Sequence, residues 1–152
     1  MDTVQVQRAT GHELAELVPL FAGYLRFYHR PADEARIAAF LGDRLRGAQS
    51  VVFMAYLAER AIGFVQLYPA FASLAMAPSW ILNDLYVAPQ ARGIGAGRAL
   101  LEAARGLASD TGAAELFLQT ARDNLGAQRL YESQGFQRDD VFLTYSLDPR
   151  AA

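Results

Sequence analysis

The chain has 152 residues, 53% of them hydrophobic and 20% charged, which is the balance of a folded globular protein, so we expect a single domain over residues 1–152. Its formal net charge of −2 at pH 7 indicates neither the basic footprint of a nucleic-acid-binding protein nor the polybasic face of a membrane-binding one. Cysteine is absent and no apolar run is long enough to cross a bilayer, so disulfides and thiol nucleophiles are excluded and we expect a cytoplasmic protein.

The N-terminal third of the chain predicts one strand and two helices. Apolar and polar residues alternate over residues 4–7, which is typical of a strand with one buried face. A capping box begins at Thr10 and predicts the start of a helix, whose apolar stripe runs over residues 14–28. Asp33 can cap a second helix, and Gly47 closes it.

Three strands are expected in the middle of the chain. Residues 51–57 and 61–68 are apolar and rich in β-formers, and Glu59-Arg60 makes a tight connection between them, so the two strands must be antiparallel. Residues 69–78 begin and end with proline and predict an apolar loop. The third strand, over residues 81–87, has apolar residues along most of its length.

The C-terminal half alternates helices and strands. Three glycines at positions 93, 95 and 97 precede a helix that Gly112 ends, and a short strand over residues 115–120 follows. A strand, a helix and a second strand in this order predict a parallel pair with a right-handed crossover. A helix over residues 124–134 and a final strand with alternating apolar residues over 141–147 complete a mixed α/β fold.

The stretch that joins the strand at 81–87 to the following helix has the chemistry of a phosphate site. A helix N-terminus carries unpaired N–H groups and a partial positive charge, and glycines allow a ligand to approach the backbone closely. Arg92 and Arg98 add full positive charges. A Walker loop would need a Lys that is absent here, and a dinucleotide fingerprint would need Gly where Arg98 stands.

The spacing that fits is Gln-Ala-Arg-Gly-Ile-Gly over residues 90–95, preceded by Leu-Tyr-Val-Ala-Pro over 85–89. It resembles the acetyl-CoA-binding core of the GNAT superfamily of N-acetyltransferases. The later run from Asn124 through Tyr131 to Phe136 resembles the next block of the same family. The resemblance implies the order strand-helix-helix-strand-strand-strand-helix-strand-helix-strand, with a sheet that splays after its central strand.

The resemblance also implies how acetyl-CoA would be held, without a metal ion. The backbone of Leu85 and Val87 would pair with the pantetheine arm, since a peptide-like arm can add to a splayed strand as a further strand would. The diphosphate would lie on main-chain N–H groups of the glycine loop. The cofactor-binding residues expected on this basis are Leu85, Tyr86, Val87, Gln90, Arg92, Gly93, Ile94, Gly95, Ala96, Gly97, Arg98, Asn124 and Tyr131.

Two residues of the last predicted helix are candidates for roles in catalysis. Asn124 and Tyr131 lie seven residues apart and therefore share one helix face. The resemblance implies that Asn124 contacts the cofactor arm and that the hydroxyl of Tyr131 can protonate the departing thiolate. The alternative for Tyr131 is a helix residue that only packs on the sheet.

The general base is the position where this sequence departs from the family. Many relatives carry Glu on the central strand where this chain has Asn83, which cannot accept a proton as a base. The acid comes one residue later, at Asp84, and one step along a strand reverses the face. Asp84 is therefore either a relocated base or an ion-pairing residue that points elsewhere, and Asn83 could orient the amine or a water molecule. Deprotonation through a chain of water molecules is the remaining alternative.

The acceptor side of the site is expected to be aromatic. Tyr24, Tyr28 and Trp80 could hold an amine by cation–π contact, although Tyr24 and Tyr28 also lie on the buried stripe of the first helix. The expected reaction is transfer of an acetyl group from acetyl-CoA to a primary amine of a small molecule, or of a peptide or protein, by direct attack in a ternary complex. The alternatives are a non-catalytic acyl-CoA-binding module and a nucleotide-binding α/β protein, and a homodimer is possible in each case.

Overall fold

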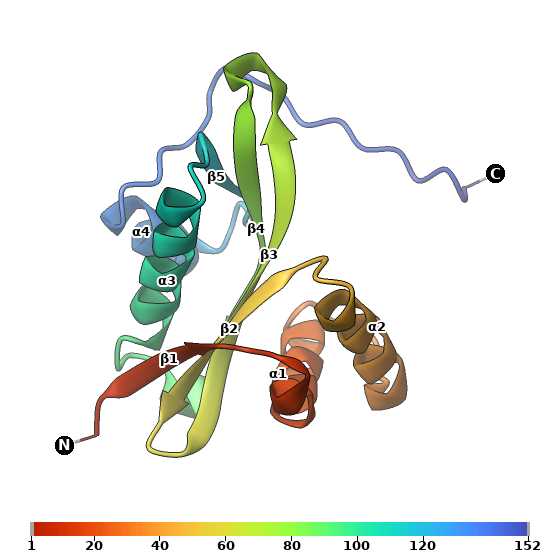
Figure 1. The fold of residues 1–152 in the computed structure, drawn as a ribbon, viewed down its shortest axis with the longest axis vertical. Helices are drawn as coiled ribbons and strands as arrows, with labels where there is room; N and C mark the ends of the chain where they lie inside the picture. The colour runs from red at the N-terminus through yellow and green to blue at the C-terminus, as the bar shows by residue number, and fades with distance from the viewer. Residues whose placement is uncertain (1, 152) are drawn as a thin grey trace.

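Two pairs of helices cover the two faces of a five-stranded sheet in the computed structural model, which describes residues 2–151 (Figure 1). Helices α1 (Leu14–Phe27) and α2 (Glu34–Arg46) lie on one face, and α3 (Ala96–Asp110) and α4 (Leu125–Ser133) lie on the other. The strands are β1 (Val4–Arg8), β2 (Val51–Leu57), β3 (Arg60–Ala72), β4 (Ala77–Val87) and β5 (Glu115–Leu118). The predicted mixed α/β fold is confirmed.

The strands lie in the order of the sequence, β1-β2-β3-β4-β5. The first four strands are antiparallel to their neighbours, and β5 runs parallel to β4. The antiparallel β2–β3 pair and the parallel β4–β5 pair are the two that the sequence predicts. The β4–β5 ladder joins only residues 79–82 to residues 115–118. Residues 83–87 of β4 therefore have no strand on that side, and the predicted splay after the central strand is confirmed.

A β-bulge interrupts β4 immediately after the last residue that pairs with β5. Gln66 of β3 lies opposite Asp84 and Leu67 lies opposite Leu82, so Asn83 has no opposite residue. Side chains of Trp80 and Leu82 pack toward α3 before the bulge, and those of Leu85 and Val87 do so after it. The bulge thus changes which residues reach each face, and it places Asp84 on the face that α1 covers, beside Gln66.

The helix starts are set by local hydrogen bonds, as predicted. The main-chain N–H of Thr10 donates to the carboxylate of Glu13 at 2.9 Å, and the Thr10 hydroxyl accepts from the backbone of His12, so a single 3-10 turn leads into α1. The carboxylate of Asp33 accepts from the first N–H groups of α2. These caps fix where the two helices begin beside the sheet.

Each face of the sheet has its own core. On the α1 side Phe64 is fully buried with Leu17 and Met54, and on the α3 side Val65 is fully buried with Leu100. Phe64 and Val65 are adjacent in β3, so their side chains point to opposite faces of the sheet, as in any strand. No helix within residues 2–151 is both long and apolar enough to span a membrane.

The predicted loop over residues 69–78 is wrong, because β3 and β4 continue through it as a hairpin. β3 extends to Ala72 and β4 begins at Ala77, with a 3-10 turn between them. The prolines are tolerated because Pro69 lies beyond the end of the β2 ladder and Pro78 comes before the β5 ladder begins, so each needs to pair on one side only. The hairpin projects past the helices (Figure 1).

The predicted final strand over 141–147 is not formed, and the two short elements before it are slightly shorter than expected. Residues 141–147 have no strand partner among residues 2–151, since alternation specifies a strand face but not the neighbour that a ladder needs. β5 ends at Leu118, and α4 begins after Asn124, which is its N-cap.

We predict that Leu100→Ala lowers the free energy of unfolding by about 2–5 kcal/mol, because the side chain is fully buried where α3 meets β3 and its loss leaves a cavity. Leu107→Ala on the same helix is the control. Its side chain is half-buried, so it should cost clearly less in urea denaturation. Equal losses for the two variants would contradict this packing of α3.

Candidate active site

A cleft of about 610 Å³ opens where β4 and β5 part. Its walls are the C-terminal half of β4, the end of α1, the loop and first turn of α3, and the inner face of α4. The cleft therefore exists because β5 is short and stops pairing at residue 118.

The glycine loop presents its main-chain N–H groups to this cleft. Gly93 and Gly95 have φ angles of 84° and 93°, which residues with a Cβ rarely adopt, and Gly95 is the N-cap of α3 with no side-chain cap. The first bond of the helix joins the N–H of Ala99 to the carbonyl of Gly95 at 3.0 Å. The N–H groups of residues 93–98 have no hydrogen-bond partner within the described chain, so they are available to an anion.

The charges around the loop favour a negatively charged ligand. Arg92 and Arg98 line the cleft, and none of the residues that line it is acidic. The Arg92 side chain is held in place, since its Nε donates to the carbonyl of Val87 at 3.0 Å and its guanidinium lies 5.8 Å from the rings of Phe27 and Tyr86. The positive end of α3 adds to this field.

Asn124 and Tyr131 both reach the cleft from α4. The Asn124 Oδ1 accepts from the N–H of Ala127 at 3.2 Å as the helix cap, which leaves its Nδ2 group as a donor toward the cleft. Tyr131 packs against Phe136 with ring centroids 5.8 Å apart. Burial, with a smaller contribution from Tyr28, raises the pKa of Tyr131 to about 12, so its hydroxyl is protonated at neutral pH.

Asp84 is the centre of a buried polar cluster on the α1 face of the sheet. It is 5% exposed, and its two oxygens accept from Gln66 Nε2 at 2.8 Å and from Asn83 Nδ2 at 3.1 Å. The Tyr24 hydroxyl lies beside it and donates to the carbonyl of Asn83 at 3.4 Å. Burial raises the pKa of Asp84 above its usual value, and the hydrogen bonds from Gln66, Tyr24 and Asn83 oppose that shift.

The alternative that Asp84 forms an ion pair is contradicted, because every side chain that contacts its carboxylate is neutral. Asn83 lines the cleft, whereas Asp84 lies just behind it and is connected to it through Asn83 and Tyr24. A buried carboxylate with neutral partners and a raised pKa is a candidate proton acceptor.

Gln66 is the member of this cluster that sequence reasoning missed. It is 1% exposed, and its Oε1 has no hydrogen-bond partner in the structure. The signal in the sequence was a Gln inside the otherwise apolar run of β3, because a polar side chain that is buried in a strand needs a hydrogen-bond partner. Phe27, Gln119 and Thr120 also line the cleft and were missed, because nothing local to the sequence indicates that the ends of α1 and β5 meet there.

Most of the other predicted site residues line the cleft, but Gln90, Ile94 and Trp80 do not. Those that the structure brings to the cleft are Tyr24, Tyr28, Asn83, Leu85, Tyr86, Val87, Arg92, Gly93, Gly95, Ala96, Gly97, Arg98, Asn124 and Tyr131. Gln90 and Ile94 belong to the loop but do not line the cleft. Trp80 does not reach it either, which corrects the expectation that it holds the amine: it lies before the bulge, packs toward α3 and donates from Nε1 to the Thr111 hydroxyl at 2.8 Å.

Comparisons with known proteins agree with this geometry. The acetyltransferase (GNAT) family matches residues 14–136. The uncharacterized N-acetyltransferase YhfO of Bacillus subtilis is 41% identical over 145 residues, which cover 95% of this chain and 97% of that protein. The aminoglycoside N(6')-acetyltransferase type 1 of Stenotrophomonas maltophilia is 29% identical over 96% of this chain and 95% of its own length. A crystal structure of a probable acetyltransferase, 39% identical, superposes with a TM-score of 0.92 over 97% of this chain and 99% of the other.

A splayed mixed sheet with an uncapped helix start at its opening is the architecture that this chain shares with a probable acetyltransferase of known structure. With the family match and the 41% identity, it shows that this chain belongs to the GNAT family of acetyltransferases and is an N-acetyltransferase. Members of this family use acetyl-CoA.

Proposed function

We propose that this enzyme transfers the acetyl group of acetyl-CoA to a primary amine of a small molecule by direct attack in a ternary complex. The observation that carries the proposal is the row of unpaired N–H groups over residues 93–98, which lies where the sheet opens. Bound acetyl-CoA supplies an acetyl group activated as a thioester. The cytoplasmic location expected from the sequence is part of the same proposal.

The cleft has the groups that this donor requires. The N–H groups of the glycine loop, with Arg92 and Arg98, suit the diphosphate, since all carry full or partial positive charge. The free main-chain edge of residues 83–87 suits the amide-containing pantetheine arm. The Nδ2 group of Asn124 can donate to a carbonyl of the same arm.

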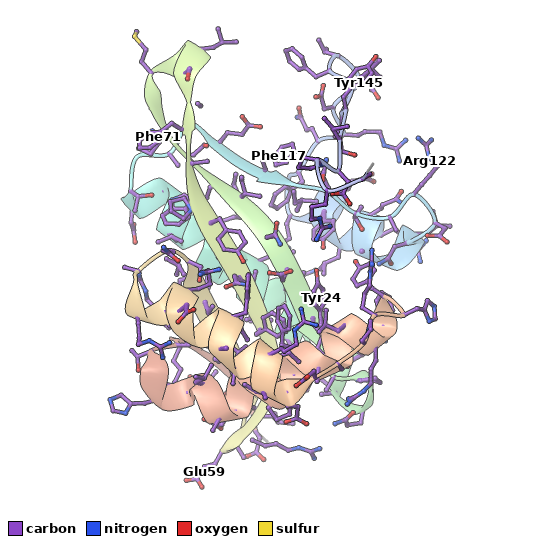
Figure 2. All side chains as sticks on the ribbon, turned by 90° about the vertical axis from the view of Figure 1, so that its right-hand side faces the viewer. Tyr24, Glu59, Phe71, Phe117, Arg122 and Tyr145 are labelled. Atoms are coloured by element: carbon purple, nitrogen blue, oxygen red, sulfur yellow. The ribbon has the colours of Figure 1, made fainter. Side chains whose placement is uncertain are left out.

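The acceptor amine would bind on the α1 side of the cleft. Tyr24 and Tyr28 lie edge to face there with ring centroids 5.2 Å apart, and their rings can contact a cationic amine before it loses its proton. Figure 2 shows Tyr24 at the edge of α1 beside the sheet. Because the lining of the cleft contains no carboxylate, it supports an acceptor with one amine better than a polycation such as an aminoglycoside.

Deprotonation of the amine falls to Asp84. An amine with a pKa of ~10.4 is neutral in only about one molecule in 2,500 at pH 7, so the enzyme must take up a proton. Asp84 can accept it through a water molecule or through the hydroxyl of Tyr24, and its raised pKa makes it a stronger base than an exposed aspartate. Asn83, which lines the cleft and donates to Asp84, would position the amine or that water.

Tyr131 would act on the departing sulfur as a hydrogen-bond donor. Burial raises its pKa above the ordinary tyrosine value of ~10, which already exceeds the thiol value of ~8.5, so complete proton transfer to the thiolate is unfavourable. A neutral hydroxyl that donates to a developing thiolate still stabilises it, by about 1.5–3 kcal/mol for a bond to a charged group. A buried Tyr131 would therefore keep its proton and stabilise the developing thiolate through a hydrogen bond.

The direct test is release of free thiol from acetyl-CoA in the presence of a panel of amines: monoamines, polyamines, aminoglycosides, amino acids and a lysine-containing peptide. We expect release with small monoamines and weaker release with aminoglycosides. Tight acetyl-CoA binding without release from any amine would instead support the non-catalytic acyl-CoA-binding alternative.

We predict that Gly95→Glu raises the Kd for acetyl-CoA in calorimetry by at least about 100-fold. The backbone of Gly95 has a positive φ that Glu tolerates poorly, and a carboxylate would face the diphosphate. Gly106→Glu is the matched control, because it adds the same charge at an exposed position of the same helix where a Cβ meets open space. Unchanged affinity in Gly95→Glu, with an unchanged melting temperature, would rule out the loop as the binding site.

We predict that Tyr131→Phe lowers kcat by about 10- to 100-fold, the loss expected when one hydrogen bond to a developing thiolate is removed, while the Kd for acetyl-CoA changes little. Tyr56→Phe is the control, since it removes a hydroxyl that donates to Glu16 far from the cleft and should leave kcat unchanged. Should the two variants have equal kcat, Tyr131 has no role in the chemical step.

We predict that the kcat/KM of the wild-type enzyme falls as the pH is lowered through the raised pKa of Asp84, because protonated Asp84 cannot accept the proton of the amine. Asp84→Asn should lower kcat/KM by about 100-fold or more and abolish this acid limb. Glu59→Gln, at the exposed β2–β3 turn, should leave the profile intact. An acid limb that persists in Asp84→Asn assigns it to another group.

A further inference from the structure

Gln66 is a polar residue in the buried, apolar part of β3. In the two ladders of that strand it lies opposite Val52 of β2 on one side and Asp84 of β4 on the other. Gln66 and Val52 are each 1% exposed, and Phe64, two residues earlier on the same face, is fully buried. A methionine or leucine would suit such surroundings, because a buried amide that lacks hydrogen-bond partners destabilises a fold.

The side chain of Gln66 makes one hydrogen bond within residues 2–151, and that bond goes to Asp84. The Gln66 Nε2 donates to Asp84 Oδ2 at 2.8 Å. The Gln66 Oε1 is buried without a partner. Since half of the amide is unsatisfied, the contact with the carboxylate of Asp84 is the one interaction that explains a polar side chain at this position.

The hydrogen bonds of Asp84 distinguish its two oxygens. Oδ2 accepts from Gln66, which does not line the cleft. Oδ1 accepts from Asn83 Nδ2 at 3.1 Å, and Asn83 does line the cleft. Gln66 therefore holds the carboxylate with Oδ2 toward the interior and Oδ1 toward the cleft. A carboxylate oxygen has two lone pairs, so Oδ1 can still accept a proton.

Neutral donors control the ionisation of Asp84, and Gln66 has the largest effect among them. Burial and the charge of Asp84 raise the pKa of Tyr24 and of Tyr68, so both hydroxyls keep their protons at neutral pH, and Arg44 opposes the rise in the pKa of Tyr68. The titratable or charged side chains that face Asp84 or these two tyrosines come from α1, β3, α2 and α4: Tyr24, Tyr28, Tyr68, Arg44 and Tyr131.

We propose that Gln66 is the positioning residue that keeps Asp84 ionised and presents its Oδ1 to the proton of the acceptor amine. This inference rests on the proposed function, in which Asp84 is the base. An N–H bond of the amine breaks, its electron pair stays on nitrogen, and an O–H bond forms at Asp84 Oδ1. The proton travels through water or through Tyr24, whose hydroxyl accepts one proton and passes on its own.

The chemistry of an amide suits this role better than that of the other side chains of similar size. An apolar residue would leave the buried carboxylate without its inner donor and would favour the protonated acid, which cannot act as a base. A cation would stabilise the carboxylate so strongly that its affinity for a proton would fall. The neutral Nε2 group of Gln66 lies between these limits.

The first test is the pH profile of kcat/KM for Gln66→Met, which keeps the length of the side chain and removes the amide. The pKa of Asp84 should rise further, so the acid limb moves to higher pH. We expect kcat/KM to be about tenfold or more below wild type on the acidic side, with a gap that closes toward the alkaline plateau. Gln66→Leu should behave in the same way.

Gln7→Met is the control, since it makes the same change at an exposed position of β1 and should leave the profile unchanged. A Gln66→Met profile that coincides with wild type overturns the proposal. A profile that is lowered by the same factor at every pH also overturns it, because that is the result of a structural defect.

The second test needs no activity, so it separates this inference from the proposed function. Urea denaturation of wild type and Gln66→Met is compared from acidic to alkaline pH, and again with Asp84→Asn added to each. A carboxyl whose pKa is raised by folding stabilises the fold at low pH, and this stability is lost as the pH rises through the raised pKa. Gln66→Met should therefore lose stability relative to wild type as the pH rises, and Asp84→Asn should abolish that trend.

A stability difference between wild type and Gln66→Met that does not depend on pH overturns the inference, because Gln66 then has no effect on the ionisation of Asp84. The expected trend in a protein that releases no thiol with any amine would instead overturn the proposed function and leave the pairing of Gln66 with Asp84 established.

Discussion

The early end of the β4–β5 ladder is the constraint on which the rest of this structure depends. β5 pairs with only four residues of β4, and the next five continue without a neighbour on that side. Unpaired main-chain groups are costly when they are buried dry, so an edge left open in this way must face water or a ligand. The cleft forms at this edge, and α3 begins beside it with its own unpaired N–H groups. One short strand thus leaves the open edge of β4 and the unpaired N–H groups of α3 in the same cleft.

The bulge at Asn83 places a buried acid, Asp84, directly behind the cleft. The extra residue sets Asp84 beside Gln66 and Tyr24 on the α1 face, and directs Asn83 to the cleft. Burial destabilises the ionised carboxylate and so raises the pKa of Asp84. Hydrogen bonds from neutral donors stabilise the ionised form and limit that rise. The unpartnered Oε1 of Gln66 is part of the cost of this arrangement.

Sequence patterns predicted the structure correctly where it depends on residues that are close together in the chain. The capping box at Thr10, the cap at Asp33 and the helical stripe after the glycines all form as expected, because each depends on contacts within a turn or two. The order of elements from β1 to α4 and the family followed from hydrophobic period and from the spacing of residues 90–95. The loop residues reach the cleft together because they are consecutive in the chain.

The sequence by itself therefore determined the helix starts, the directions of the β2–β3 and β4–β5 pairs and the family, since these depend on short-range patterns. Only the tertiary structure decided the position of the bulge, the extension of the hairpin through Pro69 and Pro78, and the removal of Trp80 from the cleft, because each depends on which strand lies opposite and where its ladder stops. The same reason applies to residues 141–147. Their alternation specifies a strand with one apolar face, but a strand exists only where another supplies its hydrogen bonds, and a chain's own residues do not reveal which edge that will be.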